Sequence, residues 1–162
     1  MNPDTPDARI RERELAAPTM RGRRPAENAA SREPLTEQTL RAEVASGTID
    51  TVIVAFTDMQ GRLQGKRFHA PFFLDHVLAH GAEGCNYLLT VDVEMNTVPG
   101  YAMTSWESGY GDMMFALDLD TLRRTPGQSY SATVQADLTW MDGGGPVRPS
   151  PRSVLKAQIE AA

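Results

Sequence analysis

An apolar run at residues 49–58, IDTVIVAFTD, constrains the fold more than any other part of the chain. Apolar and β-branched residues fill it almost throughout, which predicts a strand that is buried and central in its sheet. The run stops at Asp58, and the following MQGR predicts a turn in which Gly61 supplies the positive φ that such turns often need. The next segment, LQGKRFHA, is predicted to return as the second strand of a hairpin.

The remaining elements follow in an order that predicts the fold class. Two helices are predicted. The first is LTEQTLRAEVASG, with Thr36 as N-cap and Leu40 and Val44 on one face, and the second is PFFLDHVLAHG, which closes at Gly81 and has Phe73, Val77 and Leu78 on one side. Three more strands are predicted over CNYLLTVD, DMMFALDL and YSATVQADLTW. The order strand–strand–helix–strand–strand–strand predicts an α+β fold of the β-grasp type (a ubiquitin-like roll), with a mixed sheet and a helix packed across one face.

The two ends of the chain differ from its middle. Residues 1–34 are rich in Pro, Arg, Glu and Ala and predict a disordered N-terminal tail, so the β-grasp domain is assigned to residues 35–147. In residues 148–162, Ser150 and Pro151 predict the start of a linker helix. Its apolar stripe is Val154, Leu155 and Ile159. Because such a stripe needs a packing partner, we expect the helix to lead into a further domain.

Charge and cysteine content exclude several classes of protein. Residues 36–162 hold nine Lys and Arg against fifteen acids, a balance of about −6 that argues against a nucleic-acid-binding module. No apolar run approaches the roughly 20 residues of a membrane span. The single cysteine, Cys85, fits a reducing compartment, and the N-terminus lacks the apolar segment of a secretory signal. A cytoplasmic protein is the expectation.

Candidate sites other than the turn have ordinary alternatives. His76 and His80 stand at i, i+4, a spacing that can chelate zinc, but no third ligand is evident nearby, so we expect no metal site. Asp92 and Glu94, with Asp112 beyond the long segment, could bind ammonium groups or form a scattered acidic surface. Other side chains have two interpretations each: Lys66 and Arg67 could face a neighbouring subunit or solvent, and Cys85 has no identifiable base to make it a nucleophile.

Four blocks in order carry a resemblance to a known family: FTDMQGRLQGKRF, GAEGCNYLLTVD, GYGDMMFALDLDTLRRTPG and SPRSVLKAQIEAA. Together they resemble the N-terminal β-grasp domain of glutamine synthetase-type ligases, and more closely the branch of γ-glutamylpolyamine synthetases and other glutamine synthetase-like proteins. The likeness spans about residues 36–162. It implies a role in nitrogen metabolism, in an ATP-dependent ligase that activates the γ-carboxylate of glutamate for attack by an amine.

The resemblance also implies what the chain alone lacks. In this family the ATP site and the carboxylates that hold Mg²⁺ or Mn²⁺ belong to a large C-terminal domain, and nothing in the sequence corresponds to it. The chain alone is therefore expected to bind no cofactor and to be inactive. Family members form stacked rings of six subunits, with each active site between one C-terminal domain and the neighbour's β-grasp domain. The implied partner is a copy of the same protein or a related full-length ligase subunit.

A loop after the third strand is the small domain's contribution to the amine site in this family. Ammonia-using members carry an Asp-Gly-Ser-Ser motif there, and the aspartate position falls on Cys85, followed by Asn86 and Tyr87. A thiol offers no formal countercharge to NH₄⁺, which favours a larger amine or no catalysis. Trp106 lies near the family's loop tryptophan and is expected at the subunit interface. Two alternatives remain, a stand-alone β-grasp interaction module and an inactive remnant.

Overall fold

The computed structural model describes residues 34–105, 107, 109–141 and 143–162. The predicted tail therefore lies almost wholly outside the described residues. The elements, in chain order, are α2 (Glu37–Ala45), β1 (Thr51–Thr57), β2 (Leu63–His69), α3 (Ala70–Phe72), the π-helical turn η1 (Phe73–Val77), α4 (Leu78–His80), β3 (Ala82–Cys85), the 3₁₀ helix η2 (Asn86–Leu89), β4 (Asp112–Arg124), β5 (Ser131–Trp140) and α5 (Pro151–Glu160).

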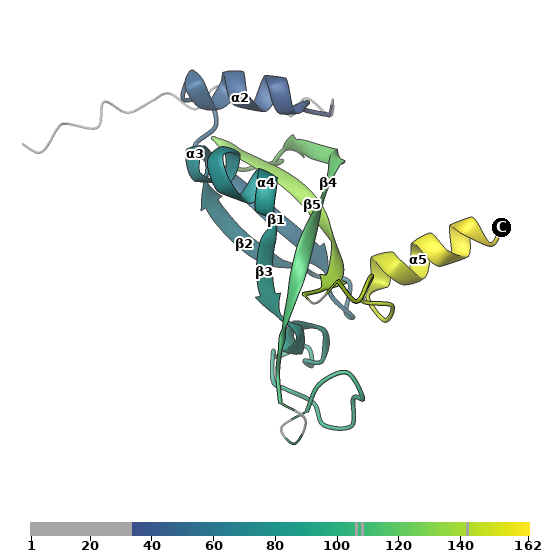
Figure 1. Ribbon diagram of the computed structural model, residues 1–162. Helices are drawn as coiled ribbons and strands as arrows, with labels where there is room; N and C mark the ends of the chain where they lie inside the picture. The colour runs from purple at the N-terminus through teal and green to yellow at the C-terminus, as the bar shows by residue number, and fades with distance from the viewer. Residues whose placement is uncertain (1–33, 106, 108, 142) are drawn as a thin grey trace, which may run out of the picture.

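Five strands form one mixed sheet in the order β2-β1-β5-β4-β3. The β1–β5 pair is parallel, and the other three pairs are antiparallel. The strand β1 lies between β2 and β5, as its apolar sequence predicts. The continuous helical segment of α3, η1 and α4 connects β2 to β3 and lies across one face of the sheet (Figure 1). The predicted α+β class, with a mixed sheet and a helix across it, is confirmed.

The core lies between this helical segment and the sheet. Phe73 and Val77 turn inward from the helical segment, with at most 3% of their surface exposed. Phe56 of β1 and Phe115 of β4 pack ring to ring, with centroids 5.1 Å apart. The helix α2 adds Leu40, which is fully buried, while its capping residue Thr36 accepts a hydrogen bond from the Thr39 backbone N–H at 3.1 Å. Apolar periodicity therefore predicted the buried faces correctly.

The β1–β2 hairpin uses two glycines in different ways. Gly61 in the turn has φ +80°, the left-handed conformation that glycine adopts without strain. Gly65 lies in β2, opposite Ala55, and a Cβ built on it would lie 1.9 Å from the Val54 carbonyl oxygen. No side chain fits at that distance, so the hairpin requires glycine at both positions.

Two predicted strands differ from the observed ones. The prediction of a strand over CNYLLTVD was wrong, because β3 covers Ala82–Cys85 and only the first residue of that segment lies in the sheet. The partner strand β4 begins opposite Cys85 at Asp112, so the chain leaves the sheet there and turns into η2. Conversely, β4 continues to Arg124, through residues predicted as a connection. A register shift between Asp118 and Arg123 allows this, and the Thr121 hydroxyl bridges it by accepting a hydrogen bond from the Gln135 backbone N–H at 2.8 Å.

The last helix, α5, contacts the sheet through charged residues. Its N-cap is Ser150 with Pro151 following, as predicted. Arg152 pairs with Asp118 and Asp137, and Lys156 also pairs with Asp137. The stripe of Val154, Leu155 and Ile159 remains 49%, 60% and 67% exposed, and the helix projects away from the sheet (Figure 1). No helix in the described part of the chain is long and apolar enough to cross a membrane.

The exposed stripe predicts self-association of the 162-residue chain, because association removes apolar surface from water. Leu155→Glu together with Ile159→Glu is expected to abolish a concentration-dependent rise in sedimentation coefficient. The matched control is Gln158→Glu, which adds a charge to the same helix at a polar position and is expected to leave association unchanged. A parent chain that stays monomeric up to about millimolar concentration, the range of weak association, would contradict the prediction.

Candidate functional site

The predicted substrate-loop residues lie together where β3 ends. Cys85 is the last residue of β3 and is half-buried, and Asn86 and Tyr87 are the first two residues of η2. The Asn86 backbone N–H donates to the Gly111 carbonyl at 2.8 Å, and the Asn86 side-chain oxygen accepts from the Gly111 N–H at 3.2 Å. Asn86, which is 5% exposed, thereby joins the two ends of the segment 86–111.

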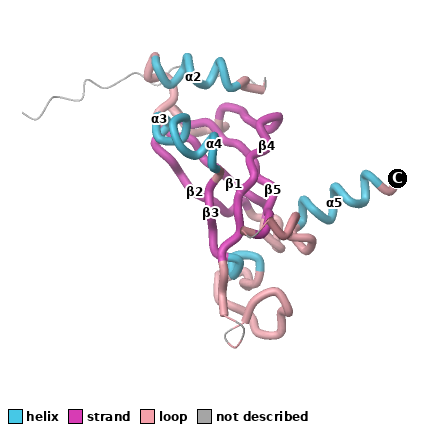
Figure 2. Tube along the Cα trace, in the orientation of Figure 1, coloured by secondary structure: helices cyan, strands magenta, loops and turns pink. Residues whose placement is uncertain are grey.

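A second contact between the ends of this segment is aromatic. The rings of Tyr87 and Tyr110 meet edge to face, with centroids 6.2 Å apart. Trp106, expected at a subunit interface, lies outside the described residues. Figure 2 shows the described residues between Asn86 and Gly111 as a short helix followed mainly by loop, extending beyond the end of the strands. Cys85, Asn86 and Tyr87 thus stand at the base of a projecting loop whose two ends are held together.

The turn after β1 is built around a buried carboxylate. Asp58 has no exposed surface. Its side-chain oxygens accept hydrogen bonds from the backbone N–H groups of Gln60 and Arg62 at 3.0 and 2.8 Å, from Arg62 Nε at 2.7 Å and from Gln64 Nε2 at 3.0 Å. Burial raises the pKa of Asp58, but the donors from Gln64, Arg62 and Gln60 outweigh burial and lower the pKa below its ordinary value. The side chain is therefore a satisfied, ionised carboxylate.

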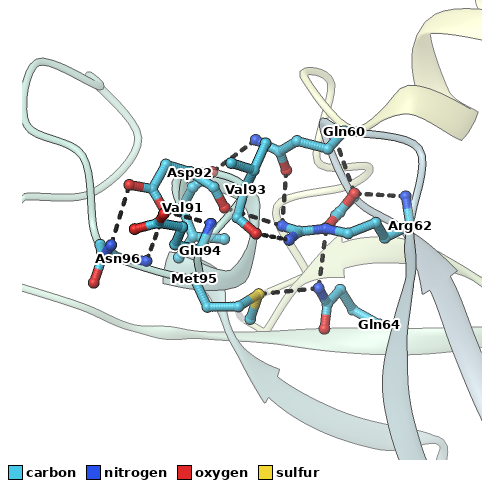
Figure 3. A network of polar contacts seen from close by, with 10 residues as sticks. Gln60, Arg62, Gln64, Val91, Asp92, Val93, Glu94, Met95 and Asn96 are labelled. Carbon is cyan, nitrogen blue, oxygen red and sulfur yellow. Dashed lines mark hydrogen bonds and ion pairs between the residues drawn. The ribbon is translucent and has the colours of Figure 1, made fainter.

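Side chains of the same turn form hydrogen bonds with the projecting loop (Figure 3). Arg62 donates to the carbonyl oxygens of Val93 at 2.7 Å and Asp92 at 3.1 Å. Gln60 Nε2 donates to the Val91 carbonyl at 2.8 Å. A fourth contact runs from Gln64 Nε2 to the Met95 sulfur at 3.3 Å. We call Asp58, Gln60, Arg62 and Gln64 the turn clamp.

The clamp goes beyond the hairpin chemistry predicted for Asp58 and Gly61. Both residues do form the hairpin, since the Gly61 N–H donates to the Asp58 carbonyl at 3.0 Å. The prediction missed that Gln60, Arg62 and Gln64 contact residues that lie about 30 positions later in the sequence. The only signal in the sequence is the group of polar side chains around Gly61, and it does not indicate a contact with residues about 30 positions further along the chain.

The acidic residues considered for ammonium binding do not form a site together. Asp92 accepts hydrogen bonds from the backbone N–H groups of Glu94 and Asn96, each at 2.9 Å, and these contacts shape the tip of the clamped loop. The backbone hydrogen bond from Asn96 is the main cause of its lowered pKa. Asp112 lies apart from this tip, opposite Cys85 in the sheet. Asp92 thus shapes the loop itself.

Other candidate residues have structural contacts. His80 Nδ1 lies 2.9 Å from the His76 carbonyl oxygen, and Arg67 donates to the Gln128 side chain at 2.9 Å, while Lys66 is exposed. Among the described residues, no group of three or more His, Cys, Asp or Glu side chains could hold a metal ion. The described residues therefore offer no set of ligands that fits the metal, which the resemblance assigns to the C-terminal domain.

A small cleft lies in the projecting loop beside the tyrosine pair. Its volume is about 270 Å³. Backbone bridges between Val91 and Thr97 and between Ser105 and Gly109 shape the loop around it. The residues lining it are Thr97, Val98, Pro99, Ser105, Glu107 and Tyr110. The sequence did not indicate this cleft, because its lining combines residues 97–99 with Ser105, Glu107 and Tyr110, which are separated along the chain.

Comparison with known proteins gives two relatives by sequence. The chain is 60% identical over 127 residues to γ-glutamylethanolamide synthetase GlnA4 of Streptomyces coelicolor, covering 78% of this chain and 27% of the relative. It is 34% identical over 123 residues to a glutamate–isopropylamine ligase of a Pseudomonas species, covering 76% of this chain and 27% of the relative. The chain thus spans about a quarter of the length of these curated relatives. No protein-family model matches it.

Solved structures show the same fold. A GmaS–ADP complex matches with a TM-score of 0.56 at 22% identity, over 76% of this chain and 25% of that one. A structure described as a novel glutamine synthase homologue matches with a TM-score of 0.57 at 21% identity, over 70% of this chain and 26% of that one. At this level of identity the likeness establishes the fold.

Removal of the Asp58 charge is expected to destabilise the chain and loosen the loop. Asp58→Asn would place amide hydrogens against donors of Arg62 and Gln64, at a cost of about 2 kcal/mol in the free energy of unfolding. Amide hydrogens of residues 92–98 are expected to exchange faster with deuterium. The matched control is Asp75→Asn, at an exposed helical acid, with neither effect expected. Equal exchange in both variants would show that the clamp does not hold the loop.

The same carboxylate predicts a pH dependence of stability. Asp58 and Asp137 have pKa values lowered from 3.8 in the folded chain; for Asp137, burial opposes the lowering and the contacts of Lys156 and Arg152 cause it. Their stabilisation is therefore present above the ordinary pKa and is lost as the pH falls through the lowered values. The free energy of unfolding, measured with urea between about pH 3 and 6, the range where carboxylates titrate, is expected to change less steeply with pH in Asp58→Asn than in the parent chain. Identical slopes would contradict this.

Proposed function

We propose that this chain belongs to the glutamine synthetase family and acts as the N-terminal domain of an ATP-dependent ligase that joins the γ-carboxylate of glutamate to a small amine. The observation that carries the proposal is the high identity to γ-glutamylethanolamide synthetase across most of the described fold. The second relative is named for isopropylamine, another small amine. The remaining three quarters of such a ligase would supply the ATP and metal sites.

The domain's own contribution is a positioned loop. Three sets of contacts hold the segment 86–111: Asn86 with Gly111 at its neck, the edge-to-face tyrosines beside them, and the turn clamp on residues 91–95. A loop held in this way keeps its shape when it meets another protein surface, which lowers the entropic cost of forming a shared site. We propose that the loop closes the amine site of a neighbouring subunit, in a homo-oligomeric ring or on a related full-length ligase.

The loop's chemistry favours an amine larger than ammonia. Cys85 offers a thiol where ammonia-using members carry an aspartate. The neighbouring Asn86 oxygen already accepts the Gly111 N–H. The start of the loop therefore offers no carboxylate to a bare NH₄⁺ ion, whose desolvation needs a countercharge. An amine with an aliphatic substituent gains apolar contact in addition to its ionic contacts and depends less on this one position.

A chimera tests this function directly. The matching N-terminal segment of the Streptomyces coelicolor synthetase is replaced by that of this chain, and ATP-dependent γ-glutamyl amide formation is measured with ethanolamine, ethylamine, isopropylamine and ammonium. We expect activity with the small amines within about tenfold of the parent, equivalent to a barrier change of about 1.4 kcal/mol, and little with ammonium.

Cys85→Asp in the same chimera is the matched variant. Adding the carboxylate is expected to lower the KM for ammonium by about tenfold, the value of one hydrogen bond to a charged group. A chimera that assembles as its parent does but forms no γ-glutamyl amide would refute the proposed function. A chimera that uses ammonium as readily as ethylamine would refute the amine preference alone.

A further inference from the structure

We propose that the cleft lined by Thr97, Val98, Pro99, Ser105, Glu107 and Tyr110 is the subsite for the acceptor amine, and that it takes a primary ammonium group carrying a short aliphatic substituent. This inference rests on the proposed function and deepens it. It identifies Glu107 as the countercharge to the ammonium group and the Val98–Pro99 wall as the contact for the substituent. We call this cleft the amine cleft.

The lining combines the groups that an alkylammonium ion needs. Glu107 supplies a carboxylate, and Thr97 and Tyr110 supply hydroxyl oxygens that can accept hydrogen bonds from N–H donors. The aromatic ring of Tyr110 can also attract a cation. Val98 and Pro99 form an apolar wall on which carbon atoms of a substituent can pack.

Glu107 is ionised and oriented before any ligand arrives. Hydrogen bonds from its own backbone N–H and from the Ser105 side chain lower its pKa below the ordinary value. A carboxylate retains several acceptor positions when one or two are used, so it can still accept from an ammonium group. Cys85 leaves the start of the loop without a charge, and Glu107 supplies one further along the same loop.

The position of the cleft links it to the residues predicted for the substrate loop. Tyr110 lines the cleft and packs edge to face on Tyr87, the residue after Asn86. On the other side, the Val98 N–H donates to the Thr90 carbonyl at 3.0 Å, directly after η2. The turn clamp holds the intervening residues 91–95. The cleft and the substrate loop are thus two parts of one supported structure.

The size of the cleft limits the amine. At about 270 Å³ it lies below the 300–1,000 Å³ or so of typical small-molecule pockets. It has room for an ammonium group with a few carbon atoms, whereas most of a long polyamine would remain outside. Short alkylamines are therefore expected to be preferred to spermidine, and also to ammonium, which makes no contact with the apolar wall.

The test measures steady-state kinetics of the chimera with ethylamine, carrying Glu107→Gln, Glu107→Asp or the control Glu83→Gln, an exposed acid of β3. Glu107→Gln is expected to raise the KM for ethylamine at least about tenfold, since a charged hydrogen bond is lost. The KM values for glutamate and ATP are expected to stay unchanged. Glu107→Asp is expected to recover part of the loss, and Glu83→Gln to behave as the parent.

An unchanged KM for ethylamine in Glu107→Gln, or an equal rise in the KM values for glutamate and ATP, would overturn the inference. A chimera that assembles as its parent does but is inactive would refute the proposed function, and a second measurement then decides the inference. The 162-residue chain is titrated with ethylammonium chloride while the backbone amide signals of Ser105 and Tyr110 are followed by NMR. Saturable shifts that disappear in Glu107→Gln support the amine cleft, and their absence in the parent chain overturns it.

Discussion

The structure of this chain around its projecting loop depends on one buried carboxylate. Asp58 lies at the end of a central strand, where an uncompensated charge would cost several kcal/mol. Four donated hydrogen bonds satisfy it, and two of them come from the side chains of Arg62 and Gln64. Because these side chains are held at the carboxylate, their remaining groups are fixed in direction and reach the neighbouring loop. A local turn thereby controls a segment about 30 residues away.

This arrangement explains how the exposed part of the loop keeps a defined shape, while Leu89 and Val91 nearer its start are buried, each 2% exposed. Val93 at its tip is 73% exposed, so apolar burial contributes little there. Backbone carbonyl groups of the loop instead accept hydrogen bonds from the turn clamp. Asn86 joins the two ends of the loop through hydrogen bonds of its backbone and its side chain. Loops that carry binding residues commonly rely on a rigid scaffold for their position. Here the hairpin and the end of β3 together provide it.

The sequence predicted the fold well and the site only in part, for physical reasons. Hairpin turns, the buried face of a helix and helix caps are determined by residues close together in the sequence. The hairpin, the buried face with Phe73 and the cap at Ser150 could therefore be predicted. The extension of β4 was missed because it depends on a side-chain bridge from Thr121 to another strand. The clamp and the amine cleft were missed for the same reason. Cys85 was singled out by family resemblance and not by periodicity, and its role at an amine site stays a prediction.

The helix α5 shows how charge can decide which face of a helix meets a sheet. Arg152 and Lys156 contact Asp118 and Asp137 on β4 and β5, and these paired groups are largely shielded from solvent except at Lys156. Partial shielding makes such pairs stronger than fully exposed ones, and sharing Asp137 between two cations fixes the helix rotation. The apolar stripe must then face outward. The ion pairs therefore hold α5 in one orientation without help from its apolar residues. In a longer ligase, a domain that packs on the stripe would bind a helix whose orientation is already set.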